Sequence, residues 1–125
     1  MRTKFVLGAV AAVAGVVAGP VSPASAAPID DCRGLQLVCV FEHPNHGGDA
    51  VWTGVENGTY NTQYRTRTTA SNVVNATTDR YVILRPASGW GECKVWPRSE
   101  INLPGHINDN LGQIVIGGWT DVPSC

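Results

Sequence analysis

The sequence predicts an all-β domain, built as a sandwich of two four-stranded Greek-key motifs. From Cys32 onward, short apolar runs recur between turns rich in glycine, proline and asparagine. No window of about twelve residues in this part shows the clean 3.6-residue apolar period that indicates a helix. In addition, the second half of the chain partly repeats the first. Eight short strands with this spacing are typical of a sandwich.

The first motif is expected over about residues 36–76, with four strands. Each strand is a short run that contains β-branched or aromatic residues. The turns between them contain residues that accept a positive φ or fix φ near a turn value, such as Pro44-Asn45, Gly47-Gly48 and Asn57-Gly58. The predicted strands are 36–42, 50–53, 59–62 and 72–75.

The second motif is expected over about residues 79–117, with four more strands of the same kind. Turn residues again separate them, including Gly89, Pro97, Pro104-Gly105 and Asp109-Asn110. The predicted strands are 80–85, 93–96, 100–103 and 113–116.

The two motifs align with each other along most of their length. At an offset of 44 residues, His46 aligns with Trp90 and Trp52 aligns with Trp96. At an offset of 41 residues, two later segments align: 59–61 with 100–102, and 71–74 with 112–115. Each motif has one apolar face and needs the other motif to cover it.

The composition describes a small exported domain. The chain has 125 residues and a formal net charge of -1, with 15% charged residues, which excludes a multidomain enzyme, a coiled coil and a basic nucleic-acid-binding protein. Residues 1–26 have the pattern of an export signal, with Arg2 and Lys4 before an apolar run that is too short to span a membrane. We therefore expect a secreted, monomeric domain of residues 27–125 that binds neither nucleic acid nor membrane.

Catalytic and zinc chemistry have little support in the sequence. The serines of the exported part lie in turns, strand starts or the tail, and none has the pattern of a nucleophile elbow: Ser71, Ser88, Ser99 and Ser124. His43, His46 and Asp49 resemble part of a zinc site, but no fourth ligand is evident nearby. We expect no enzymatic activity, and we expect His46 to stack within its hairpin instead.

The tryptophans divide into two groups. Trp52 and Trp96 occupy equivalent positions of the two motifs, so we expect both to pack in the core or between the sheets. Trp90 lies between Gly89 and Gly91 in a loop, where exposure to solvent is expected.

The first motif resembles the Greek-key motif of the βγ-crystallins. Phe41, His46 and Gly48 match its pattern of an aromatic residue, four residues, an aromatic residue, one residue and a glycine, and the strand Ser71-Asn72-Val73-Val74 follows. Together with the leader, the opening CRGLQLVCVFE and the segment NDNLGQIV, this makes the chain similar to secreted bacterial βγ-crystallin-like proteins. These proteins include metalloproteinase inhibitors of the SMPI type. The resemblance implies the fold and suggests inhibition, although the same fold also serves calcium binding and toxins.

The second motif departs from the family pattern in its hairpin loop. Arg85 stands in the place of the first aromatic residue, and Glu92 stands in the place of the glycine. In calcium-binding members, two acidic or amide residues precede a hydroxyl ligand, whereas here Asn108 and Asp109 precede Gly112. A calcium ion needs six or more oxygen ligands, so Asn108 and Asp109 are weak candidates for a calcium site, and no cofactor is expected.

Two disulfides are expected from the four cysteines, because an even number of cysteines in an exported domain favours disulfides over metal binding. Three pairings are open to them. The short separation of Cys32 and Cys39, and a similar close pair in the SMPI-type relatives, favour Cys32 with Cys39 and Cys93 with Cys125. Cys32 with Cys125 is the alternative.

The resemblance also implies an inhibitory segment. In the SMPI-type relatives the reactive segment looks similar to Glu92-Cys93-Lys94-Val95-Trp96-Pro97, and a disulfide-braced strand of this kind would be presented to the cleft of a secreted protease. The reactive bond would follow Cys93, with Lys94 or Val95 entering the enzyme and Pro97 stiffening the exit. Thermolysin-like enzymes prefer an apolar residue after the cut, so Lys94 does not match them. The alternative function is that of a non-inhibitory stress or envelope protein with a weak or vestigial calcium site.

Overall fold

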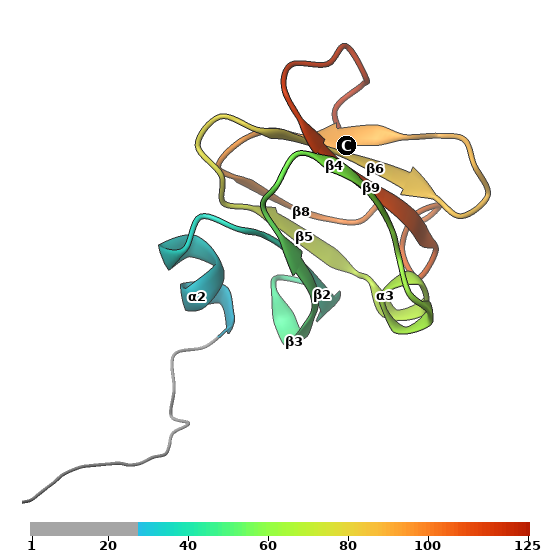
Figure 1. Ribbon diagram of the computed structural model, residues 1–125. Coiled ribbons are helices and arrows are strands. Elements are labelled where there is room, and N and C mark those ends of the chain that lie inside the picture. Colours follow the sequence, from blue (N-terminus) through green and yellow to red (C-terminus); the bar gives the residue numbers. More distant parts are fainter. Residues whose placement is uncertain (1–27) are drawn as a thin grey trace, which may run out of the picture. The chain divides into compact units, whose positions relative to one another are not determined.

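The structure is a computed structural model, and it describes residues 28–125 (Figure 1). This part of the chain contains eight strands and two short helices. The expected export signal lies outside the described residues. Residues Cys32–Cys125 form one compact unit. The elements are α2 (Pro28–Gly34), β2 (Val38–His43), β3 (Gly47–Gly54), β4 (Gly58–Asn61), α3 (Tyr64–Thr69), β5 (Asn72–Asn75), β6 (Tyr81–Pro86), β7 (Cys93–Val95), β8 (Ser99–Asn102) and β9 (Leu111–Gly117). All eight predicted strands are present, with ends that differ by a few residues.

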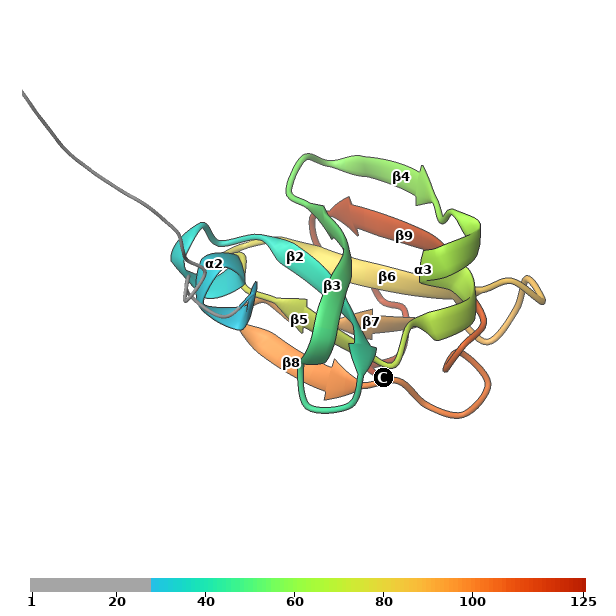
Figure 2. The same cartoon turned by 90° about the horizontal axis from the view of Figure 1, so that it is seen from below.

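The strands form two four-stranded antiparallel sheets, and each motif contributes one strand to the sheet of the other. The first sheet has the order β3-β2-β5-β8, and the second has the order β4-β9-β6-β7 (Figure 2). Strand β8 of the second motif therefore pairs with β5 of the first, and β4 of the first motif pairs with β9 of the second. This exchange gives the Greek-key connection, and it confirms the predicted all-β sandwich.

The internal repeat is also visible in the register of the two exchanged strands. Asn72 on β5 pairs with Asn102 on β8, and Gln113 on β9 pairs with Asn61 on β4. These two pairs are related by the 41-residue offset. Each carries the same side-chain hydrogen bond: Asn72 Nδ2 donates to Asn102 Oδ1 over 2.9 Å, and Gln113 Nε2 donates to Asn61 Oδ1 over 2.8 Å.

Aliphatic side chains from both sheets meet between them and form the core. Along β6 the burial alternates strictly, as a strand with one covered face requires. Burial of these branched side chains is the main source of stability in a domain of this kind. The largest contributors, all fully or almost fully buried, are Val38, Val40, Val73, Val82, Leu84, Ile107, Leu111, Ile114 and Ile116.

Helix α3 was not predicted, because its sequence has weak helix propensity and its stability comes from tertiary contacts. Its N-cap residue Gln63 makes no side-chain capping bond. Instead, Thr66 Oγ1 donates to the carbonyl of Val51 over 2.9 Å, and Arg65 pairs with Asp49 over 3.0 Å. A six-residue helix is too short to show a periodic apolar pattern. Neither of the helices described here is long and apolar enough to cross a membrane.

The disulfides join Cys32 to Cys39 and Cys93 to Cys125, which is the pairing that was preferred from the sequence. The second disulfide holds the C-terminal tail along the outer edge of β7. There the Lys94 N–H donates to the carbonyl of Pro123 over 2.8 Å, and the Cys125 N–H donates to the carbonyl of Lys94 over 2.9 Å. The tail therefore extends the second sheet by one parallel bridge, between Lys94 and Ser124.

Candidate functional site

The hairpin loop between β2 and β3 folds back onto the outer face of the first sheet. The ring of His46 packs edge-on against Phe41, with 6.3 Å between ring centroids, which confirms the predicted stacking. His46 Nδ1 also lies 2.8 Å from Glu100 Oε2 on β8. The neighbouring Asn45 N–H donates to Asn102 Oδ1, also on β8, over 2.8 Å. Positive φ angles at Asn45 and His46 make this reversal of the loop possible.

Glu100, on β8, is the charged residue that the folded-back loop contacts. Its partial burial would raise the pKa of the carboxyl group, but hydrogen bonds from His46 and Asn72 and the charge of Arg33 outweigh burial, so the pKa of Glu100 is lowered. Asn72 Nδ2 donates to Glu100 Oε2 over 2.9 Å, and Arg33 lies 3.2 Å from Glu100 Oε1. In the first hairpin, the ring of His46 packs on the sheet, and the polar atoms of Asn45 and His46 form hydrogen bonds with it.

The hairpin loop between β6 and β7 does not fold back onto its sheet as the loop between β2 and β3 does. The position of Phe41 is taken by Arg85, whose Nε donates to Glu92 Oε1 over 2.7 Å and so closes the base of the loop with an ion pair. Trp90, which is equivalent to His46, does not pack on the sheet and is 79% exposed, as predicted. Residues 87–91, which we call the second hairpin loop, are all exposed and project from the same end of the domain as α3 (Figures 1 and 2).

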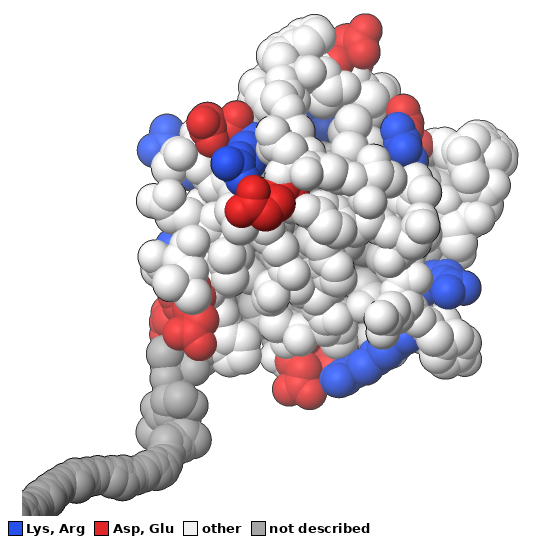
Figure 3. All heavy atoms as spheres, in the orientation of Figure 1, with Lys and Arg blue, Asp and Glu red and all other residues white. Residues whose placement is uncertain are grey.

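The second hairpin loop is held at several points in spite of its exposure. Gly89 and Gly91, which flank Trp90, have φ angles of 95° and 88°, a region that side chains disfavour. The carbonyl of Gly91 lies 2.7 Å from His106 Nε2. The Ala87 N–H donates to the carbonyl of Asn110 over 2.8 Å. The second hairpin loop has no charged residue, so the lobe at the right edge of Figure 3, where this loop lies in Figure 1, is white. Elsewhere on that face, charges of both signs are interspersed.

The segment Glu92–Pro97, predicted as inhibitory, forms a buried strand over most of its length. Cys93, Lys94 and Val95 make up β7 and are buried, and only Glu92 and the residues after Val95 reach the solvent. One edge of β7 pairs with β6, and the other is covered by the C-terminal tail. The second hairpin loop is therefore accessible from outside, whereas the bond after Cys93 is not.

Lys94, predicted to enter the protease, is engaged inside the domain. Its Nζ donates to the carbonyl of Thr120 over 2.8 Å and lies over three aromatic rings, with the ring of Trp96 nearest at 4.8 Å. Trp96 itself is 46% exposed, so the expected burial is wrong for Trp96. Its indole N–H donates to Ser124 Oγ over 2.7 Å, which ties the ring to the tail rather than to the core. The equivalent Trp52 does pack against the core, next to Tyr60.

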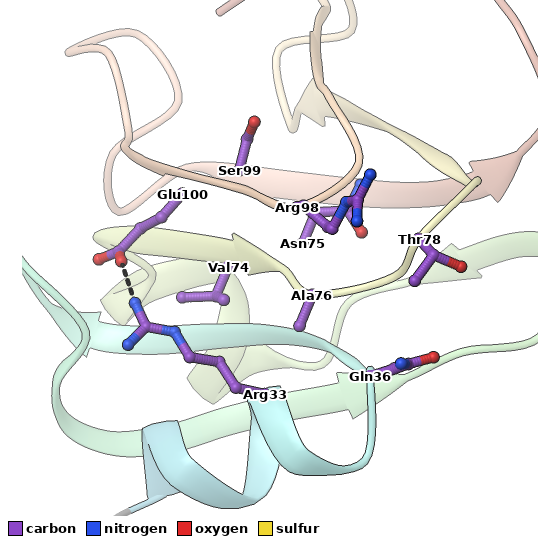
Figure 4. Close-up of a pocket in the computed structure, with 9 residues that line it drawn as sticks. All are labelled: Arg33, Gln36, Val74, Asn75, Ala76, Thr78, Arg98, Ser99 and Glu100. Carbon is purple, nitrogen blue, oxygen red and sulfur yellow. Dashed lines mark hydrogen bonds and ion pairs between the residues drawn. The ribbon is translucent and has the colours of Figure 1, made fainter.

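Two hollows are relevant to ligand binding. One, of about 610 Å³, lies beneath the second hairpin loop and is lined by Arg67, Arg85 and Gln113, among others. The other, of about 370 Å³, lies at the end of the first sheet, where Arg33 is already paired with Glu100 (Figure 4). Arg98, which is exposed, also lines this hollow, and its guanidinium has no ion pair or hydrogen bond among the described residues.

The calcium candidates do not assemble a cation site with the residues around them. Asp109 lines a shallow hollow with Glu42 and Ser71, but the Glu42 carboxylate already accepts the Asp49 N–H over 2.8 Å and lies 3.4 Å from Arg65. The backbone hydrogen bond to the Asp49 N–H is the main cause that lowers the pKa of Glu42. No group of three or more His, Cys, Asp or Glu side chains within residues 28–125 is placed to hold a metal.

Comparison with known proteins gives one informative match, at the level of structure. No protein-family model and no curated protein sequence matches this chain. A solved structure described as "Evolution of the eye lens beta-gamma-crystallin domain fold" superposes with a TM-score of 0.53 at 16% sequence identity. The match covers 68% of this chain and 88% of that one. The chain therefore has a βγ-crystallin-like fold.

Proposed function

We propose that this chain is a secreted protease inhibitor that contacts its enzyme through the second hairpin loop, with Trp90 as the central contact residue. The observation that supports this is the asymmetry of the two hairpins: His46 packs on its sheet, whereas the equivalent Trp90 is 79% exposed. An aromatic ring that stays this exposed contributes little to the stability of an isolated domain, and large aromatic side chains are typical of the centre of a protein interface.

The loop also has the rigidity that an inhibitor requires. A loop that is already held in its bound shape loses little conformational entropy when it binds. The Arg85–Glu92 ion pair, the contact between His106 and Gly91, and the disulfide at Cys93 immediately after the loop all restrict it. The similarity to SMPI-type inhibitors supports a protease as the partner, and two disulfides are consistent with secretion.

This proposal places the contact one segment upstream of the strand predicted from the sequence. Glu92 belongs to both segments, but Lys94 and Val95 are buried in β7. Cleavage after Cys93 would require the C-terminal tail to leave the edge of that strand. We therefore expect inhibition by occlusion, in which the loop blocks the active-site cleft and the chain is not cut.

The test is a titration of the secreted protein against thermolysin-like and trypsin-like proteases. We expect Trp90→Ala to weaken inhibition at least about tenfold, since interface centres of this kind contribute 2 kcal/mol or more. Trp119→Ala is the matched control, because Trp119 is a tryptophan of similar exposure (72%) that follows the C-terminal end of β9. Equal losses in both variants would reject Trp90 as the central contact residue. No inhibition of either enzyme class at micromolar concentration would reject the proposal as a whole and favour a non-inhibitory protein of the same fold.

A further inference from the structure

The hollow beneath the second hairpin loop has an unmatched positive charge. Arg67, on α3, is partly buried and lines the hollow, and its guanidinium has no hydrogen bond or ion pair with any residue in the described part of the chain. Arg85 lines the same hollow, and its guanidinium uses only two of its N–H groups, toward Glu92 and Gln113. Two guanidinium groups therefore line one hollow, and Glu92, the carboxylate that pairs with Arg85, is not among the lining residues.

The first sheet shows what occupies the equivalent place. There a carboxylate, that of Glu100 on β8, lies on the outer face of the sheet and accepts hydrogen bonds from His46, Asn72 and Arg33. The repeat offset makes Thr59, on β4 of the second sheet, the equivalent of Glu100. The second sheet thus keeps the amide partner, as Gln113, and has guanidinium groups nearby, but it has no carboxylate at this position.

We propose that the hollow beneath the second hairpin loop binds the carboxylate of an aspartate or glutamate side chain presented by the partner protein. A planar carboxylate matches the fork of a guanidinium group, and such charge-assisted hydrogen bonds are the strong ones. The hollow, at about 610 Å³, is large enough to admit a side chain from outside. The inference rests on the proposed function for the identity of the partner, because residues of the second hairpin loop line the hollow, and the hollow and Trp90 would engage one protein surface.

The site can be tested without any protease. The secreted protein, labelled with nitrogen-15, is titrated with the peptides Ac-Ala-Glu-Ala-NH2 and Ac-Ala-Gln-Ala-NH2, and the NMR shifts of backbone amides 87–91 and of the Arg67 Nε–H are followed. We expect the glutamate peptide to bind about tenfold more tightly than the glutamine peptide, as a charge-assisted hydrogen bond implies. This preference should disappear in Arg67→Gln and survive in part in Arg67→Lys, which keeps the charge.

Arg98→Gln is the matched control, because Arg98 lines the other hollow, at the end of the first sheet, and this variant should keep the full preference. Equal binding of both peptides, or a preference that persists in Arg67→Gln with an unchanged amide spectrum elsewhere, would overturn the inference. The two proposals fail separately: a glutamate preference without protease inhibition overturns the proposed function alone, and inhibition without the preference overturns the carboxylate site alone.

Discussion

Replacing His46 by alanine is expected to lower the free energy of unfolding by about 2 kcal/mol, although the same change at Trp90 should be almost neutral. The hydrogen bond of His46 Nδ1 to the Glu100 carboxylate, at 2.8 Å, belongs to a class that contributes about 1.5 to 3 kcal/mol. The side chains of His46 and Glu100 are 35% and 25% exposed, so we take the lower end, about 1.5 kcal/mol. The edge-on contact with Phe41 adds about 0.5 kcal/mol.

Trp90 is a larger side chain, but its removal should change the free energy of unfolding by less than about 0.5 kcal/mol, as is usual for an exposed position. Urea denaturation of the protein with both disulfides formed, followed by circular dichroism, measures both effects without dependence on tryptophan fluorescence. The reasoning is refuted if Trp90→Ala destabilises the domain as much as His46→Ala, because Trp90 would then pack on the sheet in solution.

Three further predictions concern stability. Replacing both Cys93 and Cys125 by alanine should cost about 3.7 kcal/mol by loop entropy for a separation of 32 residues, against about 2.4 kcal/mol for the other disulfide with its separation of 7, and urea denaturation should preserve that order. Because the pKa of Glu100 is lowered in the folded state, its ionised carboxylate stabilises the fold at pH values above the ordinary glutamate pKa. This stability is lost as the pH falls through the lowered pKa. Glu100→Gln should therefore lose less stability in acid than the unmodified chain. A Cβ atom on Gly112 would lie 2.7 Å from the backbone of the second hairpin loop, so Gly112→Ala should cost about 1 to 3 kcal/mol in thermal unfolding, while Gly117→Ala, with nothing within 4 Å, should cost less than about 0.5 kcal/mol.

The strands were predictable because their signals are local. Alternating burial along β6 and positive-φ residues in the turns are encoded within a few neighbouring residues. The repeat added long-range information, because equivalent strands must occupy equivalent places in the two sheets. Helix α3 was not predictable in this way, since three of its six residues are threonine and it is stabilised by side chains far away in sequence, such as Asp49.

The candidate site was predicted in part. The exposure of Trp90 followed from its flanking glycines, and the stacking of His46 followed from its place in the motif. The burial of Lys94 did not follow, because it depends on a tail that is 26 residues away in sequence and reaches β7 through a disulfide. The role of Arg67 was also missed, since only the three-dimensional structure brings α3 next to the second hairpin loop. One sequence signal points toward this hollow: the two repeats differ in charge at one aligned position, where one has Glu100 and the other has Thr59.

The central claim is that the second hairpin loop, rather than strand β7, meets the protease. Hydrogen–deuterium exchange of the protein, alone and in complex with a protease, tests it most directly. We predict that the amides of Ser88, Trp90 and Gly91 exchange quickly in the free protein and slow down in the complex, whereas the amides of β7, which pair with β6 and the C-terminal tail, are protected in both states. New protection at the first hairpin, or a chain cut after Cys93 with loss of protection along β7, would contradict the account.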